Sequence, residues 1–253
     1  MRVLILDSDS PLGQALTGFL EQLGRHELVP LSRAQSRWKS ERQAKKAVRR
    51  AECDVVVDIR VAASADGGHD LYDLDLKRCH WVAKAIARDK LGYLFVSSSR
   101  VFSGELGRPY KEDDELDGSD ELAELQRSAE QIVREQCEQH LIIRLGPIFS
   151  SDGPSLVTNI LGQLVEGEPL KLDNNLAGAP VSSADGARVI SAILDQLSTQ
   201  ADLWGTYHYG SSDTATYFEF AETVLAAASQ FSEFSPSVVE PLPLEDGQLR
   251  LNR

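Results

Sequence analysis

The sequence predicts an α/β protein with a doubly wound parallel sheet and a smaller C-terminal lobe. Short apolar segments alternate with longer amphipathic segments through residues 1–150. The apolar segments are hydrophobic at nearly every position, which is typical of strands that are covered on both faces. After the Gly-Pro pair at residues 146–147 the alternation weakens, and this change predicts a second, less regular part of the fold.

The expected elements follow one another in strand–helix order. The strands are expected at Arg2–Leu6, His26–Leu31, Asp54–Asp58, Leu91–Ser97 and Leu141–Arg144. The helices between them are expected at Leu12–Leu23, Lys39–Arg50, Leu71–Ala87 and Glu121–Glu138. Parallel strands need crossover connections, and these are right-handed, so we expect helices on both faces of the sheet. Sheets of this Rossmann type bind ligands in a crevice at the carboxyl ends of their strands.

The change of pattern predicts a domain boundary. We expect a Rossmann-type, nucleotide-binding-like domain over residues 1–148 and a smaller, substrate-type lobe over residues 149–253. The elements expected in this lobe are the helices Leu156–Glu166, Ala184–Ser198 and Tyr217–Ala228 and the short strand Gly205–Tyr209. The lobe is expected to lie over the crevice.

Composition argues against several classes of protein. The net charge of −13 argues against binding to nucleic acids or acidic membranes. No stretch approaches the ~20 apolar residues of a membrane helix, and the chain enters its first strand without a signal peptide. Three cysteines without CxxC spacing are expected to be buried free thiols, which favours the cytoplasm. The five histidines are scattered, so no metal site is expected.

The turn after the first strand is where a Rossmann-type protein holds a diphosphate. Glycines permit the tight turn and let the backbone approach the phosphates. Here only Gly13 remains where a glycine-rich loop has three, and Asp7 and Asp9 bring negative charge. Two interpretations stay open: a turn that only folds the protein, or residual dinucleotide binding at the start of the helix. The candidates for such binding are Ser10, Pro11, Leu12 and Gly13.

Five segments, in one order, carry a resemblance to a known family over almost the whole chain. Residues 95–104 are similar to the family's H-I-S-T-D-Y-V-F-D-G, and residues 109–114 to its P-Y-x-E-D-D. Residues 143–149 match the strand that opens its substrate lobe. Residues 173–185 resemble D-D-Q-x-G-S-P-T with a following Asp, and residues 205–221 resemble G-x-Y-H and W-Y-D-F-A. In these segments the chain resembles the dTDP-4-dehydrorhamnose reductases, a branch of the extended short-chain dehydrogenase/reductases.

The resemblance implies hydride transfer from a nicotinamide cofactor to a keto-sugar nucleotide. In the family a Tyr donates the proton, a Lys four residues later lowers its pKa, and a Ser or Thr on the fourth strand completes the site. Counted from Tyr110, the Tyr position falls on Leu122 and the Lys position on Gln126, whereas Ser98 matches the Ser or Thr. Leucine has no proton to donate and glutamine carries no charge. We therefore expect no catalysis, and any residual activity would be that of an NAD(P)-dependent oxidoreductase.

The resemblance also predicts which residues line the crevice. We expect no cofactor. If one binds, we expect NADP, because Arg33 lies where NADP-preferring relatives hold the 2′-phosphate. The family's small residues N-A-A-A after the third strand are replaced by Asp-Ile-Arg-Val at residues 58–61. The remaining candidates for cofactor binding are Asp58, Arg60 and Ser97. The candidates for the substrate-type crevice are Ser98, Arg100, Arg144, Pro147 and Pro180.

The chain ends at Arg253, about where the family's C-terminal tail R-P-x-x-S-x-L-D is expected to begin.

Two arginines near the crevice allow two interpretations. Arg60 and Arg100 are expected either to form internal ion pairs with Asp58 and Asp75 or to clamp an anionic ligand, such as a nucleotide-sugar.

The segment from Arg33 to Arg50 is strongly basic in an acidic protein. Residues 32–50 carry a local net charge of +7, which predicts either a solvated helix face or contact with an acidic protein partner.

The leading interpretation of the whole chain is a pseudoenzyme: a non-catalytic, sugar-nucleotide-reductase-like protein with a binding or regulatory role. The alternatives are an NADP-dependent reductase of a dTDP-keto-sugar with an atypical active site, and a structural subunit with a filled crevice. An oligomer is compatible with each.

Overall fold

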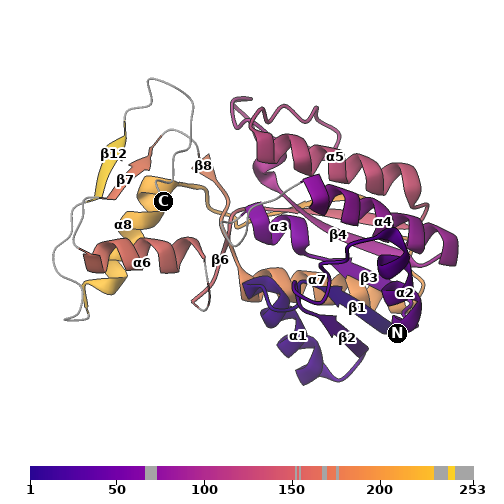
Figure 1. Ribbon diagram of the computed structural model, residues 1–253. Coiled ribbons are helices and arrows are strands. Elements are labelled where there is room, and N and C mark those ends of the chain that lie inside the picture. The colour runs from indigo at the N-terminus through magenta and orange to yellow at the C-terminus, as the bar shows by residue number, and fades with distance from the viewer. Residues whose placement is uncertain are drawn as a thin grey trace.

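A six-stranded parallel sheet forms the middle layer of the larger part of the computed structural model (Figure 1). The structure describes residues 1–65, 73–151, 153, 155–166, 170–174, 177–230 and 239–242. The strand order is β10-β5-β4-β3-β1-β2, and every neighbouring pair is parallel. The strands are β1 (Arg2–Leu6), β2 (Glu27–Leu31), β3 (Val55–Asp58), β4 (Gly92–Ser98), β5 (His140–Leu145) and β10 (Gly205–Tyr209). The predicted fold class is confirmed.

Helices cover both faces of this sheet, as the apolar strands require. One face packs against α2 (Glu41–Ala51), α4 (Asp73–Asp89) and α5 (Glu121–Gln136), and the other against α1 (Pro11–Leu23) and α7 (Ser183–Ser198). Side chains alternate between the two faces along each strand. In β1, Leu4 joins the cluster under α2 and α4, whereas Ile5 joins the cluster under α1 and α7.

Local hydrogen bonds fix where these helices begin and end. The Ser10 hydroxyl caps α1 by accepting the Gly13 amide, and Asp120 caps α5 by accepting the Ala123 amide at 2.9 Å. The left-handed Gly24 ends α1. The predicted elements agree with the observed ones to within a few residues, but the predicted helix start at Leu71 and the chain beyond residue 242 lie outside the described residues.

Two elements that the sequence assigns to the smaller lobe belong to the sheet domain instead. Strand β10 pairs with β5 along its whole length and forms one edge of the sheet. Helix α7 packs beside α1, with Ile190 and Leu194 in the same buried cluster as Leu16. The expectation was wrong for these elements because a hydrophobic period identifies an element without identifying the layer that it joins.

The smaller lobe has a modest core of its own between two helices and short strands. Its elements are β6 (Ile148–Phe149), α6 (Leu156–Glu166), β7 (Leu170–Asp173), β8 (Ala177–Gly178), β9 (Val181–Ser182), β11 (Ala215–Thr216), α8 (Tyr217–Ala228) and β12 (Val239–Leu242). Leu156, Ile160, Leu172 and Ala221 form its buried cluster. The strand pairs β6–β9 and β7–β12 are parallel, and β8–β11 is antiparallel. None of these short pairs was expected, nor were α3 (Arg60–Ala65) and the 3₁₀ turn η1 (Ser99–Val101).

The three cysteines are free and buried, as predicted. Within the described residues, no helix has the length and apolar character that crossing a bilayer requires.

Candidate functional site

The sheet brings most of the predicted site residues to one edge. The strand register sets Leu6 beside Leu31 and Asp58, and Ser98 beside Leu145. The carboxyl ends of five strands therefore lie along one edge, the edge at which parallel sheets of this type bind ligands.

The first turn closes on itself. Asp7 adopts a left-handed conformation with φ of 70°, and its carbonyl accepts the Ser10 hydroxyl at 2.8 Å. The Ser10 hydroxyl in turn accepts the Gly13 amide at 3.1 Å. A Cβ at Gly13 would lie 2.2 Å from the Asp7 carbonyl oxygen, so this glycine is required by packing alone. The geometry supports the interpretation of a turn that folds the protein, and dinucleotide binding by Ser10 to Gly13 stays a prediction.

Arg33 points into this edge and is held by protein groups. Its side chain is 7% exposed, and its Nη1 lies 3.2 Å from Asp7 Oδ2 and 3.1 Å from the Arg60 carbonyl oxygen. Its Nη2 lies 3.8 Å from Asp75 Oδ2. Burial raises the pKa of Asp7 to about 6, although the Arg33 charge opposes this shift. The position predicted to hold a 2′-phosphate therefore carries an internal ion pair.

Asp58 and Arg60 form a second buried ion pair at the end of β3. Asp58 is fully buried and accepts Arg60 Nε at 2.9 Å, Arg60 Nη2 at 2.6 Å and the Tyr93 hydroxyl at 2.8 Å. Burial raises the pKa of Asp58, but Arg60 outweighs this effect and the net shift is downward. The Arg60 guanidinium also lies 5.6 Å from the Trp38 ring centroid.

The ion pair expected between Arg60 and Asp58 is confirmed, but the partners expected for Arg100 and Asp75 were wrong. Arg100 pairs with Asp120 at 3.2 Å. Asp75 pairs with Arg78 at 2.7 Å, one turn further along the same helix. Arg78 is itself buried, and its Nε donates to the Trp38 carbonyl at 3.0 Å.

Ser98 and Gln126 meet where the resemblance expects the catalytic group. The Ser98 hydroxyl donates to Gln126 Oε1 at 2.9 Å, which agrees with the resemblance in placing these two residues in one site. Gln126 is fully buried, and its Nε2 has no hydrogen-bond partner in the described part of the chain. Leu122, one turn earlier, is partly buried. Neither side chain at these two positions of α5 has a proton that ionises near neutral pH.

Arg144 is anchored to α5 by a carboxylate that sequence reasoning missed. Glu130 is fully buried and accepts Arg144 Nε at 3.0 Å and Nη2 at 2.8 Å. Burial raises the pKa of Glu130, but the hydrogen bonds and the charge of Arg144 outweigh this effect, and the net shift of the pKa is downward. Arg144 Nη1 lies 3.0 Å from His208 Nε2, and burial together with the Arg144 charge lowers the pKa of His208. The signal for Glu130 was its position four residues after Gln126 on the same helix face.

The other crevice candidates separate in space. Ser97 is fully buried on β4 beside Glu130. Pro147 lies at the junction of the sheet and the lobe, where its carbonyl accepts the Val181 amide at 2.8 Å, next to Pro180. A Cβ at Gly146 would lie 1.8 Å from the Ala179 carbonyl oxygen, so these segments are in close contact. Among the described residues, no three His, Cys, Asp or Glu side chains gather as metal ligands.

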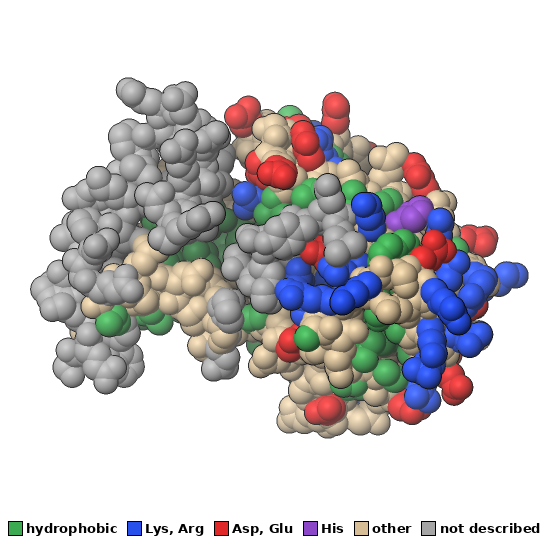
Figure 2. Space-filling view, in the orientation of Figure 1, with side chains coloured by type: hydrophobic (Ala, Val, Ile, Leu, Met, Phe, Trp, Pro, Cys, Tyr) green, Lys and Arg blue, Asp and Glu red, His purple; other side chains and the backbone are tan. Residues whose placement is uncertain are grey.

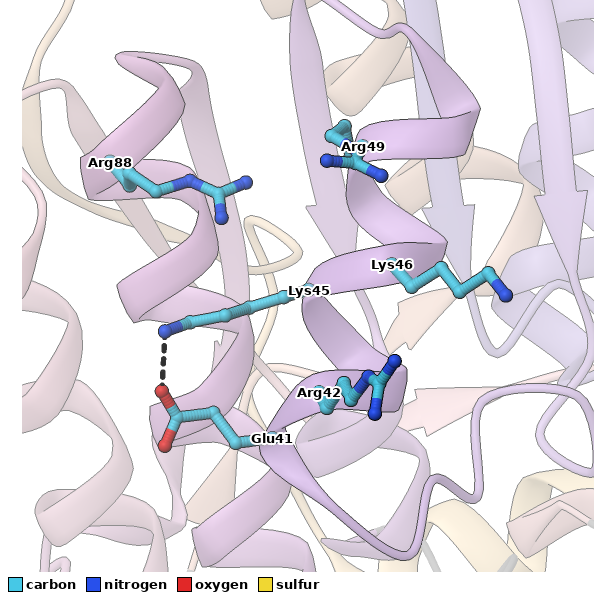
Figure 3. Close-up of a pocket in the computed structure, with 6 residues that line it drawn as sticks. All are labelled: Glu41, Arg42, Lys45, Lys46, Arg49 and Arg88. Carbon is cyan, nitrogen blue, oxygen red and sulfur yellow. Dashed lines mark ion pairs between the residues drawn. The ribbon is translucent and has the colours of Figure 1, made fainter.

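The basic segment from Arg33 to Arg50 is divided by the fold. Arg33 is buried at the crevice, whereas the cations of α2 face solvent over a hollow of about 590 Å³. We call this hollow the basic groove; it is lined by Glu41, Arg42, Lys45, Lys46, Arg49 and Arg88 (Figure 3). Figure 2 shows Lys and Arg side chains gathered on the right-hand side of the molecule, over α2 and α4.

The chain is similar to sugar-nucleotide enzymes over its whole length. The profile of the RmlD substrate binding domain family matches residues 1–253. The spore coat polysaccharide biosynthesis protein SpsK of Bacillus subtilis is 23% identical over 228 residues, which are 88% of this chain and 78% of that protein. A dTDP-4-dehydrorhamnose reductase structure from Clostridium acetobutylicum has a TM-score of 0.82 at 21% identity, covering 97% of this chain and 85% of that one. The Bacillus anthracis dTDP-4-dehydrorhamnose reductase in complex with NADP has a TM-score of 0.78 at 20% identity, covering 96% and 84%.

Proposed function

Because the chain belongs to the RmlD substrate binding domain family, we propose that it is a non-catalytic, sugar-nucleotide-reductase-like protein with a binding or regulatory role. The observation that carries this proposal is the hydrogen bond of 2.9 Å between Ser98 and Gln126, with Leu122 one turn away. General acid catalysis needs an ionisable proton within reach of the developing alkoxide, and its loss lowers rates by ~10²–10⁴. Neither α5 position supplies one.

The crevice residues also fit a nicotinamide dinucleotide poorly. Two buried carboxylates, Asp7 and Asp58, lie at the edge where a diphosphate would bring further negative charge. The two arginines that could offset this charge are engaged by those carboxylates. Pulling one partner out of a buried ion pair costs about 3–5 kcal/mol, which a ligand would have to supply. We therefore derive no chemical step through a cofactor.

A ligand titration with an activity assay tests the proposal. The protein is mixed with NADPH, NADH and dTDP-sugars, and its melting temperature and NADPH oxidation are followed. The Bacillus anthracis relative serves as the positive control. We expect no oxidation of NADPH with a dTDP-keto-sugar. A binding role through the crevice predicts a rise of a few degrees with a saturating dTDP-sugar.

The same titration separates two alternatives. An NADP-dependent reductase with an atypical active site is favoured by Arg33 at the end of β2 and Ser98 on β4, and it requires turnover of NADPH. A structural subunit with a filled crevice is favoured by the buried pairs Asp7–Arg33 and Asp58–Arg60, and it requires that no nucleotide shifts the melting temperature. In each case we propose a cytoplasmic location, because all three cysteines are free thiols.

A further inference from the structure

The cations without an acidic partner gather on one side of this acidic protein. Among the residues whose side chains the structure describes, most arginines form ion pairs, and apart from Lys111 every Lys or Arg side chain that forms none lies on α2, on α4 or in the segments that flank them. These cations are Arg37, Lys39, Arg42, Lys46, Arg49, Arg50, Lys77, Lys84 and Lys90.

Two helices carry the cations that line the basic groove. Arg42, Lys45, Lys46 and Arg49 recur every three or four residues of α2 and therefore share one face. Arg88 enters the groove from α4 (Figure 3). The hydrogen bond from Lys45 lowers the pKa of Glu41, and Lys84 and His80 of α4 act in the same direction.

This stripe of cations works against the stability of its own helix. Lys45 and Arg49 are four residues apart, as are Arg42 and Lys46, and like charges at this spacing repel. Only Lys45 has an acidic partner on α2, Glu41 at 2.5 Å. Folding alone does not explain an arrangement that weakens the helix, whereas a ligand of opposite charge does.

We propose that the basic groove binds an acidic polypeptide segment of a partner protein. This proposal deepens the binding role proposed above and rests on it. The cations lining the groove are spread along α2 and onto α4 and are exposed except for the half-buried Lys45, so they form no enclosed site for a single phosphate. Arg42 to Arg49 spans about 10 Å at the rise of an α-helix, a length that a few residues of an extended chain would match. The net charge of −13 repels a long nucleic acid or an anionic bilayer that extends beyond the groove.

A labelled oligoglutamate peptide of about ten residues is the probe, and its binding is measured by fluorescence anisotropy at rising NaCl concentration. The test variant is Arg42→Glu/Lys46→Glu/Arg49→Glu. The matched control reverses three exposed cations on other faces, Arg25→Glu/Lys111→Glu/Arg188→Glu. Both variants have the same net charge. They differ in the position of the reversed charges and in the ion pairs of Arg25 with Asp195 and of Arg188 with Asp185, which only the control loses. A neutral variant, Arg42→Ala/Lys46→Ala/Arg49→Ala, replaces the test variant if thermal melting shows that the reversal unfolds the protein.

We expect the groove reversal to weaken peptide binding at least about tenfold and the control to weaken it less than about threefold. Equal losses in both variants, or no binding to the unmodified protein, would overturn the proposal. So would tighter binding of an oligothymidylate of equal charge, of tripolyphosphate or of phosphatidylserine vesicles. Self-association that the groove reversal abolishes would assign the groove to a second copy of the chain instead. A failure here leaves the nucleotide titration unaffected, so the two proposals are judged separately.

Discussion

Gln126 stands where the resemblance expects a lysine, and its amide oxygen accepts the Ser98 hydroxyl at 2.9 Å. A lysine at this position would lie near Ser98, and its positive charge would lower the pKa of a tyrosine at position 122. Two substitutions would thus restore the acid and its neighbouring cation. The buried ion pairs at Asp7 and Asp58 are a separate obstacle, because they occupy the edge that a cofactor must reach.

The variant Leu122→Tyr/Gln126→Lys tests whether those ion pairs matter. We expect no NADPH oxidation with a dTDP-keto-sugar, because on our proposal the ion pairs Asp7–Arg33 and Asp58–Arg60 keep the dinucleotide out. The companion variant adds Asp58→Ala and Arg60→Ala, which removes the buried pair without leaving a lone charge. Absorbance of NADPH is the measurement. Turnover in the first variant would mean that the crevice admits the cofactor as it stands.

Asp7 makes the stability of the protein depend on pH in an unusual direction. Burial raises the pKa of Asp7 from 3.8 to about 6, so the folded state binds a proton more tightly than the unfolded state between these values. The contribution of Asp7 to stability is therefore present below about pH 4 and is lost as the pH rises through 6, by up to about 3 kcal/mol. Asp58 and Glu130 have lowered pKa values, so they act in the opposite sense, and their contributions to stability are lost as the pH falls below about 4.5.

Replacement Asp7→Asn removes that titration and keeps a residue that tolerates the left-handed backbone. We expect the free energy of unfolding in urea to fall less between about pH 4 and pH 6 in the variant than in the unmodified protein. Parallel pH profiles for the two proteins would contradict the assignment of this slope to Asp7.

Sequence reasoning found the positions of the site better than their contacts. Leu122, Gln126 and Ser98 were placed by the family resemblance, and the hydrogen bond between Ser98 and Gln126 agrees with that placement. The partners of Arg100 and Arg33 could not be placed, because an ion pair between distant segments depends on how the loops close. Glu130 was missed because a carboxylate in a charged helix is expected to be exposed to solvent. Its burial could be inferred only from its buried partner, Arg144.

The start of α1 shows why the turn keeps one glycine. A methyl group at Gly13 would overlap the Asp7 carbonyl, which is held in place by the Ser10 hydroxyl. Gly18 lies in the same helix, and a Cβ there meets nothing within 4 Å. Both glycines have helical backbone conformations in α1, but only Gly13 has neighbouring atoms that a Cβ would meet.

The substitutions Gly13→Ala and Gly18→Ala therefore have opposite expected effects. We expect Gly13→Ala to destabilise the protein by about 1–3 kcal/mol through overpacking. Gly18→Ala is the matched control and should stabilise it by roughly 0.5–1 kcal/mol, because alanine loses less backbone entropy in a helix. Urea midpoints measure both. A loss of stability at both positions would show that the close contact at Gly13 is not the cause.

The long elements were predictable and the short ones were not. Helix α6 was predicted with its observed bounds, Leu156–Glu166, because about three turns of apolar period leave little ambiguity. Strands β8 and β9 are two residues each and carry no period of their own. They form only because the folded chain brings β11 and β6 beside them. Pairing of this kind is a property of the tertiary structure.

The sheet domain is assembled from both ends of the sequence. Residues after the predicted boundary at 148 supply α7, which covers Ile5 and Leu141 together with α1, and β10, which pairs with β5. A fragment ending at residue 148 therefore leaves one face of the sheet half uncovered and one edge strand unpaired. Exposed apolar faces and free edges of this kind favour aggregation.

We therefore expect the fragment 1–148 to lack a cooperative unfolding transition and to bind a hydrophobic dye. The matched fragment 1–210 ends just after β10 and retains α7. It should keep a cooperative transition and the near-ultraviolet circular dichroism of a packed core, because every strand of the main sheet and every helix on its two faces is present. Gel filtration with both spectra distinguishes the outcomes. A monomeric, cooperatively folding 1–148 fragment would mean that α1, without α7, buries enough of the sheet to stabilise the domain.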